Sequence, residues 1–223
     1  MKKRITSVLL VLALCLTLLP TAALAADGNH TVDDHTKFTK LWMKDGNTLM
    51  KGNDPWTAKP IEVWGSRDED KETAYALTEG TYYLGSDIEI TQHPIMITGD
   101  VTLCLNGKQI TCGSPAPDCV IGVYANTASE LTLTDCGGTG QIAGGKNYGV
   151  KVYKGYTLNM HGGTITGNGA GVEVNGSEGK TTKLNMYGGA ISNNTGTGVR
   201  LTQYCTFTMS GGTISNNKGG VST

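Results

Sequence analysis

The sequence predicts an all-β solenoid with three short strands per rung and about five rungs. Its last third contains three near-copies of one segment: LNMHGGTITGNGAGVEV from Leu158, LNMYGGAISNNTGTGVRL from Leu184 and FTMSGGTISNNKGGV from Phe207. One such unit cannot bury its apolar face alone, so a repeat of this length indicates stacked units. Gly is frequent, at 32 of 223 residues, while Phe occurs only twice. Many Gly and Thr residues are typical of short strands joined by tight turns.

Each predicted rung carries three apolar anchors, one on each strand. The first anchors of successive rungs are separated by 28, 27, 26 and 23 residues. This variation is expected in the turns, because insertions collect in loops. The predicted anchors are Leu103, Ile110 and Ile121; Leu131, Ile142 and Val150; Leu158, Ile165 and Val172; Leu184, Ile191 and Val199; and Phe207, Ile214 and Val221.

Side chains alternate between the two faces of a strand, so pairs such as Leu158 and Met160 are expected to point inward together. Like residues then stack from rung to rung, and the stripe of Met residues is interpreted as core packing. A Gly-Gly pair follows each first strand, where a left-handed backbone needs Gly. Asparagines follow the second strands, and we expect them to form a ladder of hydrogen bonds along the axis. The ladder residues are Asn168, Asn194 and Asn217.

The repeat LxMxGGxIxxNxxxGVxV, preceded by GTYYLGSDIEITQHPIMITGDVTLCLNG, resembles the right-handed parallel β-helix repeats of secreted bacterial proteins. Those repeats belong to the broad pectate-lyase-like superfamily of folds. The resemblance covers about residues 80–223, and it implies a right-handed parallel β-helix in an extracellular protein. It does not fix an activity, because that fold serves lyases, hydrolases, adhesins and plain stalks.

Residues 1–25 have the pattern of a secretory signal peptide, with a basic start, an apolar run to Pro20 and a small-residue cleavage site before Ala26. A membrane anchor is the alternative, but the run is shorter than the roughly 20 apolar residues that span a bilayer. No later segment is predicted to cross a membrane. Cleavage would leave 15 basic and 19 acidic residues, a net charge of −4. This weak acidity does not favour nucleic acid as a partner.

Residues 26–79 are predicted to be a capping segment that covers the first rung of the solenoid, whose open end needs protection. Asp45-Gly46 predicts a hairpin, and TAYALTEG from Thr73 is expected to form a short helix. Three tryptophans lie in this segment, so a small sugar-binding module is the alternative interpretation. These tryptophans are Trp42, Trp56 and Trp64.

The given sequence stops within a predicted third strand, at Val221-Ser222-Thr223. Our expectation is that residues 80–223 form a β-helix truncated at its C-terminal end, with further rungs in a longer protein. If the chain instead ends at residue 223, the bare sheet edge predicts end-to-end self-association with another copy.

Five cysteines follow the predicted cleavage site, and an exported protein is able to form disulfides. Cys112 and Cys119 flank GSPAPD and would staple that loop; Cys104 and Cys136 lie on successive rungs and are another candidate pair. Cys205 is then left over. The sequence has no CxxC motif and no histidine pair near these cysteines. We therefore expect no metal site and no cofactor.

The third strands present the candidate ligand-binding face. Lys151, Glu173 and Arg200 are predicted to point outward on three successive rungs, about 4.8 Å apart. Tyr124 and Tyr153 are expected to share one column on adjacent rungs. A stabilising salt-bridge ladder and a surface aromatic pair are the plain interpretation. A polar track that binds an acidic or neutral glycan is the alternative.

These observations predict a non-catalytic secreted or cell-surface repeat protein, an adhesin-like or glycan-binding stalk whose partner is a polysaccharide or a host or cell-surface glycan. The alternative is the N-terminal part of a polysaccharide lyase or glycoside hydrolase with its catalytic rungs beyond residue 223. No catalytic residue is assigned: calcium needs six to eight oxygen ligands, and Glu173, Asp135 and Glu178 do not form a cluster in the sequence. Asp33-Asp34, the one Asp-Asp pair, lies outside the predicted solenoid.

Overall fold

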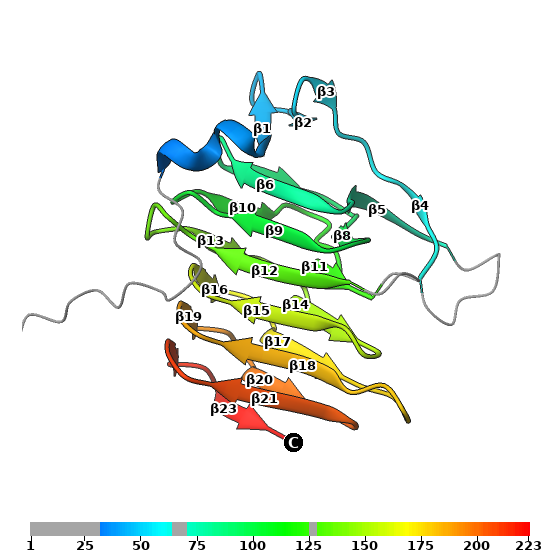
Figure 1. The fold of residues 1–223 in the computed structure, drawn as a ribbon, viewed down its shortest axis with the longest axis vertical. Coiled ribbons are helices and arrows are strands. Elements are labelled where there is room, and N and C mark those ends of the chain that lie inside the picture. The colour runs from blue at the N-terminus through cyan, green and yellow to red at the C-terminus, as the bar shows by residue number, and fades with distance from the viewer. Residues whose placement is uncertain (1–31, 64–70, 125–128) are drawn as a thin grey trace, which may run out of the picture.

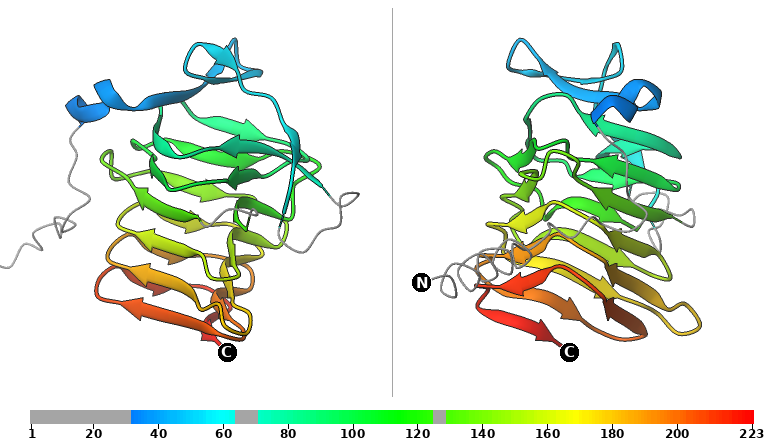
Figure 2. Two further views of the ribbon diagram at one scale, coloured as in Figure 1. Left: turned by 45° about the vertical axis from the view of Figure 1, so that its right-hand side comes forward. Right: turned by 60° about the vertical axis from the view of Figure 1, so that its left-hand side comes forward.

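A computed structural model of the chain describes residues 32–63, 71–124 and 129–223. The predicted signal peptide and Trp64 lie outside the described residues. The described part is a solenoid of about five turns, built from three sheets that run along its length (Figures 1 and 2). The predicted all-β parallel architecture is therefore confirmed. Among the described residues, no helix is long and apolar enough to cross a membrane.

Each rung contributes one strand to each of three sheets. The first sheet contains β1 (Thr39–Lys44), β2 (Thr48–Lys51), β3 (Asp54–Pro55), β6 (Gly80–Leu84), β9 (Val101–Cys104), β12 (Glu130–Thr134), β15 (Thr157–Met160), β18 (Thr182–Met186) and β21 (Cys205–Met209). The second contains β7 (Ile88–Ile90), β10 (Gln109–Cys112), β13 (Gln141–Ala143), β16 (Thr164–Thr166), β19 (Ala190–Ser192) and β22 (Thr213–Ser215). The third contains β4 (Lys59–Ile61), β5 (Glu72–Leu77), β8 (Ile95–Ile97), β11 (Cys119–Val123), β14 (Tyr148–Tyr153), β17 (Ala170–Asn175), β20 (Thr197–Leu201) and β23 (Gly219–Ser222).

The strand register confirms the predicted anchors, with one difference. The second-strand and third-strand anchors pair in the predicted order, as in Ile142↔Ile165 and Val150↔Val172. In the first sheet, however, Leu131 pairs with Val101, and Leu103 pairs with Leu133. Val101 and Leu103 both point into the core, so a shift of two residues keeps the same face buried. Strands β6, β7 and β8 also stack ahead of the five predicted rungs.

The core is a column of aliphatic and Met side chains enclosed by the three sheets. Leu158, Met160, Leu184 and Met186 have no exposed surface, and Leu158 and Met160 pair directly with Leu184 and Met186. Stacking like residues at a fixed register suits the close packing of protein interiors. The Met stripe is core packing, as predicted.

A ladder of asparagines runs along the turn after the second sheet, also as predicted. The side-chain amide of Asn168 donates to Asn194 Oδ1 at 3.1 Å, and that of Asn194 donates to Asn217 Oδ1 at 2.9 Å. The same oxygens accept the backbone N–H groups of Asn168 and Asn194 at 3.0 Å. Asn168 and Asn194 are only 1% and 3% exposed. The ladder thus satisfies buried polar groups rather than facing solvent.

The turns after the first sheet use glycine where the backbone is left-handed. The second residue of each Gly-Gly pair has a positive φ: 81° at Gly163, 76° at Gly189 and 83° at Gly212. A Cβ on Gly189 would lie 2.6 Å from the Gly163 carbonyl oxygen of the rung before it. Both the dihedral angle and the close stacking of the turns therefore require glycine.

The N-terminal residues extend the first sheet beyond the solenoid. The 3-10 helix η1 (Val32–Lys37) leads into β1, which pairs in parallel with β6 and antiparallel with β2. The predicted hairpin at Asp45-Gly46 is present, with both residues at positive φ. Figure 1 shows this segment at one end of the stack.

The expected short helix in TAYALTEG is wrong, because its first five residues belong to β5 and its last residue begins β6. Strand β5 pairs in parallel with β8 and antiparallel with β4, and its Ala74 and Leu77 are fully buried. Thr and Tyr favour a strand, and β8 provides hydrogen-bond partners for the backbone of β5. The segment is too short for its apolar residues to show a helical or a strand period.

Candidate functional site

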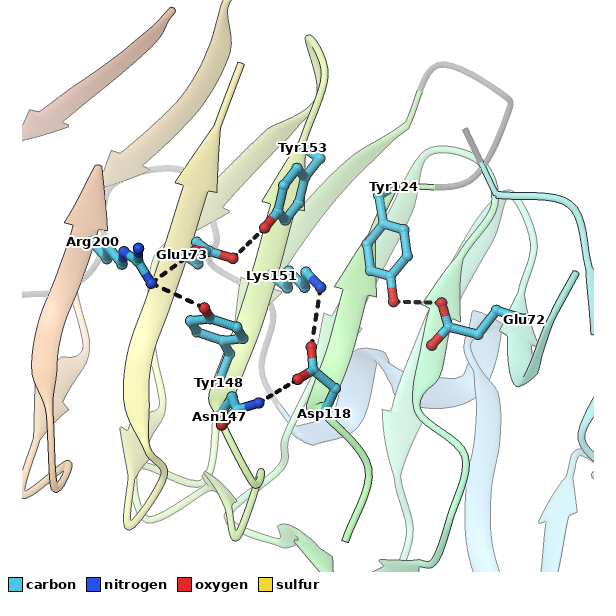
Figure 3. A network of polar contacts seen from close by, with 9 residues as sticks. All are labelled: Glu72, Asp118, Tyr124, Asn147, Tyr148, Lys151, Tyr153, Glu173 and Arg200. Atoms are coloured by element: carbon cyan, nitrogen blue, oxygen red, sulfur yellow. Dashed lines mark hydrogen bonds and ion pairs between the residues drawn. The ribbon is translucent and has the colours of Figure 1, made fainter. Parts of the chain in front are cut away.

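Outward side chains of the third sheet, together with residues of the turns beside it, form a polar network of nine residues (Figure 3). The strand register places Lys151 beside Glu173 on β14 and β17, and Glu173 beside Arg200 on β17 and β20. The sequence prediction of adjacent charges on three rungs therefore matches the register. The network consists of Glu72, Asp118, Tyr124, Asn147, Tyr148, Lys151, Tyr153, Glu173 and Arg200.

Lys151 lies at the centre of the network, among three tyrosine rings. Its Nζ is 5.4, 5.8 and 5.2 Å from the ring centroids of Tyr124, Tyr148 and Tyr153. These distances fall within the range of cation–π attraction. The carboxylate partner of Lys151 is Asp118, at 3.0 Å. Burial alone would lower the pKa of Lys151, but the hydrogen bond and charge of Asp118 outweigh it and raise the pKa above its usual value.

Glu173 is the most buried charged group of the network, with only 4% of its surface exposed. Its carboxylate accepts a hydrogen bond from the Tyr153 hydroxyl. It also forms an ion pair with the Arg200 guanidinium, at 3.5 Å. Burial and then the hydrogen bond to Glu173 raise the pKa of Tyr153 above its usual range, so this phenol stays protonated at neutral pH. The charge of Glu173 is thus balanced within the protein.

Arg200 differs from Glu173 because its side chain is 53% exposed. One guanidinium nitrogen reaches the Tyr148 hydroxyl at 3.2 Å as well as the Glu173 carboxylate. A guanidinium carries five N–H donors, so two such contacts leave others directed to solvent. Arg200 is therefore the cation of the network that is best placed to meet a ligand.

Tyr124 and Tyr153 lie in one column, as the sequence predicts, with ring centroids 6.0 Å apart in an edge-to-face arrangement. The Tyr124 hydroxyl donates to Glu72 Oε2 at 2.6 Å. Burial, followed by the charges around it, raises the pKa of Tyr124 well above its usual value. These two rings pack against each other and against Lys151, so they do not present a flat open surface for a sugar ring.

A groove of about 380 Å³ adjoins the network at Tyr148 and Arg200. Its lining includes small residues on successive rungs, among them Gly169, Ala170 and Gly196. A Cβ on Gly169 or Gly196 would lie 2.5 or 2.6 Å from a backbone oxygen of the preceding rung, so the stacking of the turns requires these glycines. The remaining lining residues offer an aromatic ring, hydroxyls, an amide and a cation: Asn147, Tyr148, Thr197, Arg200 and Ser222.

Sequence reasoning identified five members of the network and missed four. Asp118 and Asn147 lie in turns and bond to each other at 2.6 Å. Tyr148 begins β14, ahead of its inward anchor Val150, and Glu72 begins the strand that was expected to be a helix. Asp118 lies three residues before the Ile121 anchor and Tyr148 two before Val150, so the polar residues just before each third-strand anchor are the signal that points to these two.

The tryptophans of the N-terminal segment have structural roles in the described part of the chain. Trp56 is 6% exposed, packs edge-to-face on Tyr75, and donates its indole N–H to the Ala76 carbonyl oxygen at 3.2 Å. Trp42 donates to the Gly52 carbonyl oxygen and carries Lys40 over its ring. A sugar-binding module built on exposed tryptophans gains no support from this packing.

The five cysteines of the described part are free thiols. Of the two candidate pairs, Cys104 and Cys136 are in contact, with their sulfur atoms 3.2 Å apart. Burial followed by the charge of Glu89 raises the pKa of Cys112 to about 12, so that thiol is unreactive at neutral pH. Cys205, the cysteine expected to be left over, donates to the Thr202 carbonyl oxygen.

Comparison of this chain with protein-family models, with curated proteins and with solved structures gives no match.

Proposed function

We propose that this chain is a non-catalytic secreted or cell-surface protein that binds polysaccharide along the third sheet of its solenoid. Export would follow from the predicted signal peptide of residues 1–25, and the β-helix would be of the pectate-lyase-like kind found in secreted bacterial proteins. The observation that carries the proposal is the groove beside Tyr148 and Arg200, which runs across the ends of successive rungs.

The chemistry of this groove suits a chain of sugars. Tyr148 offers an aromatic face, and Asn147, Thr197 and Ser222 offer hydrogen-bonding groups for hydroxyls. The guanidinium of Arg200 is half-exposed and suits a carboxylate or a pair of hydroxyls. Because the groove crosses several rungs, a long polymer can occupy it with more than one sugar.

A binding role is favoured over catalysis by the state of the carboxylates. Glu173 is engaged by Tyr153 and Arg200, Asp118 by Lys151 and Asn147, and Glu72 by Tyr124. A general acid or base must exchange a proton with the substrate, whereas these carboxylates are held by internal partners. The lining of the groove, as described, has no carboxylate.

The test is retention of the purified protein in gels that contain a dissolved polysaccharide, with homogalacturonan and its methyl-esterified form as the two probes. The double variant Tyr148→Ala/Arg200→Ala should bind at least about tenfold more weakly, a loss of about 1.4 kcal/mol. If the guanidinium binds sugar carboxylates, wild type should prefer the unesterified polymer and Arg200→Ala should lose that preference.

The matched control is Tyr187→Ala/Lys183→Ala, which removes an exposed tyrosine and an exposed cation from the first-sheet side of the solenoid. It should be retained like wild type. Equal retention of the two double variants would exclude the groove as the binding site. Release of new reducing or unsaturated ends from either polymer would favour the alternative, a lyase or hydrolase.

A further inference from the structure

One side-chain cluster lies outside the polar network and joins three separate parts of the chain. His35 is in η1, Cys104 ends β9, and Cys136 lies in the turn after β12. One ligand atom from each of these residues lies within 4.8 Å of the other two. His35 and Cys136 are 101 residues apart in sequence. The cluster therefore forms only in the folded chain, and no short motif in the sequence could predict it.

The distances between the ligand atoms are close to those of a tetrahedral zinc site. Cys136 Sγ lies 3.6 Å from His35 Nε2 and 3.2 Å from Cys104 Sγ. Zinc bonds of about 2.3 Å to sulfur and 2.0–2.1 Å to nitrogen place tetrahedral ligand atoms roughly 3.5–3.8 Å apart. The sulfur–nitrogen separation already fits, whereas the sulfur–sulfur separation of 3.2 Å has to lengthen by about 0.6 Å. The third pair of ligand atoms, on His35 and Cys104, lies within 4.8 Å.

The surroundings of the cluster also suit a bound cation. The His35 ring is buried and stacked on Tyr83, with centroids 4.4 Å apart at 12°, so its orientation is fixed by packing. The backbone N–H of Cys136 points to Cys104 Sγ at 3.5 Å, an interaction that stabilises a thiolate.

Asn106 is oriented toward the same cluster. Its amide nitrogen donates to the Leu84 carbonyl oxygen at 3.0 Å, and its Oδ1 lies 3.6 Å from Cys136 Sγ. The bond to the Leu84 carbonyl oxygen therefore holds the Asn106 side chain beside the Cys136 sulfur.

We propose that His35, Cys104 and Cys136 bind one Zn²⁺ ion, with a water at the fourth position and Asn106 beside Cys136 as an outer-shell partner. Cysteine ligates as the thiolate, so binding releases the two thiol protons to solvent. The ion would join η1 to the rungs of β9 and β12, and thereby fasten the N-terminal segment to the end of the solenoid. This inference replaces the expectation from the sequence that the chain has no metal site.

The experiment uses the purified full chain, kept reduced, loaded first with Zn²⁺ and then with Co²⁺ as a spectroscopic probe. We expect one metal ion per chain by elemental analysis, and the cobalt form should show sulfur-to-metal charge-transfer absorption. Backbone amides of η1 and β1 should exchange hydrogen more slowly with Zn²⁺ than after chelation. His35→Ala and Cys104→Ser should each weaken Zn²⁺ binding at least about 100-fold, and Asn106→Ala about 10-fold to 100-fold.

Cys205→Ser and His93→Ala are the matched controls, since each removes the same residue type away from the cluster; both should bind like wild type. Circular dichroism identifies any variant that fails to fold, and the cobalt spectrum of wild type tests the site without any variant. Absence of charge-transfer absorption would overturn the proposal, as would equal losses in the control variants. A metal-free protein whose peptide map contains a Cys104–Cys136 disulfide, when purified without reductant from the secreted fraction, would overturn it as well.

Discussion

The asparagine ladder and the polar network are both arrays of hydrogen-bonded side chains along the axis of the solenoid, but they are built differently. In the ladder the same residue recurs on three rungs, each copy bonds to the next, and the inner members are almost fully buried. In the network the residue changes from rung to rung, from Lys151 to Glu173 to Arg200. Side-chain exposure also changes, from 5% at Glu173 to 53% at Arg200.

The difference separates the structural role from the candidate functional role. An asparagine at the same position of each rung provides hydrogen-bond partners for the buried backbone groups of a turn that every rung makes. A change of residue at one register is not required by the repeat itself, although the buried Glu173 carboxylate does need its partners Tyr153 and Arg200. We propose that the binding role lies where the solenoid departs from its own repeat.

The largest effect on stability is expected from Asn194→Ala, at the centre of the ladder. The substitution leaves the Asn168 N–H and the Ile165 carbonyl oxygen without their buried partner. Each unsatisfied buried group costs about 1–3 kcal/mol, so the free energy of unfolding should fall by about 2–4 kcal/mol. Urea unfolding followed by circular dichroism measures the change.

Asn185→Ala is the matched control for this prediction. Its amide donates a hydrogen bond to Asn159 Oδ1 at 2.9 Å, at a half-buried position. The loss should be about 1 kcal/mol or less. If the two variants lose the same free energy of unfolding, the buried ladder is no more important for stability than other stacked asparagines, and the prediction is contradicted.

A smaller effect is expected from Glu173→Gln, in the most buried part of the network. The amide still accepts from Tyr153 but no longer neutralises Arg200, which is half-exposed and is solvated instead. We expect a loss of about 1 kcal/mol, measured by the same urea titration. A loss as large as that of Asn194→Ala would mean that the network is chiefly structural.

The smallest effect is expected from acid titration of Asp118. Burial opposes ionisation of this carboxyl, but hydrogen bonds from Asn147 and Lys151, together with the charge of Lys151, hold its pKa below the usual value. Its contribution to stability is therefore complete above its ordinary unfolded pKa of about 3.9, and it is lost as the pH falls through the lower folded value.

Thermal unfolding of wild type and Asp118→Asn between pH 3 and pH 7 tests this sign. The variant should be the less stable protein at pH 7, and the gap between the two melting temperatures should narrow below about pH 4. A gap that stays constant or widens in acid would contradict the assignment of Asp118 as the charged partner of Lys151.

The sequence predicts those parts of the molecule in which each rung repeats the one before. The inward positions of Leu158 and Met160 and the bonds of the asparagine ladder follow from recurrence, because stacked copies occupy the same place. The sequence predicts that Leu103 pairs with Leu131, whereas in the structure Val101 pairs with Leu131. The sequence pattern does not distinguish the two registers, because Val101 and Leu103 are both apolar and both point into the core.

The parts that were missed depend on residues that occur once. Asp118 and Tyr148 precede the apolar positions that defined the third strands, so no repeat marked them. The expected neighbour pair of Lys151 and Glu173 exists in the register, yet Lys151 bonds to Asp118, which lies in a turn and was not considered. The cluster of His35, Cys104 and Cys136 depends on where the N-terminal segment docks, which no local pattern specifies.

The most direct test measures polysaccharide retention and unfolding free energy on the same two proteins, Asn194→Ala and Tyr148→Ala/Arg200→Ala. We predict opposite outcomes for binding: the ladder variant loses about 2–4 kcal/mol of stability and binds like wild type at a temperature where it remains folded. The groove variant removes the cation beside the buried Glu173 carboxylate and therefore also loses some stability. At a temperature where it remains folded, it should bind at least about tenfold more weakly. If the groove variant binds like wild type, or if both proteins lose binding and stability together, departure from the repeat does not mark the functional face.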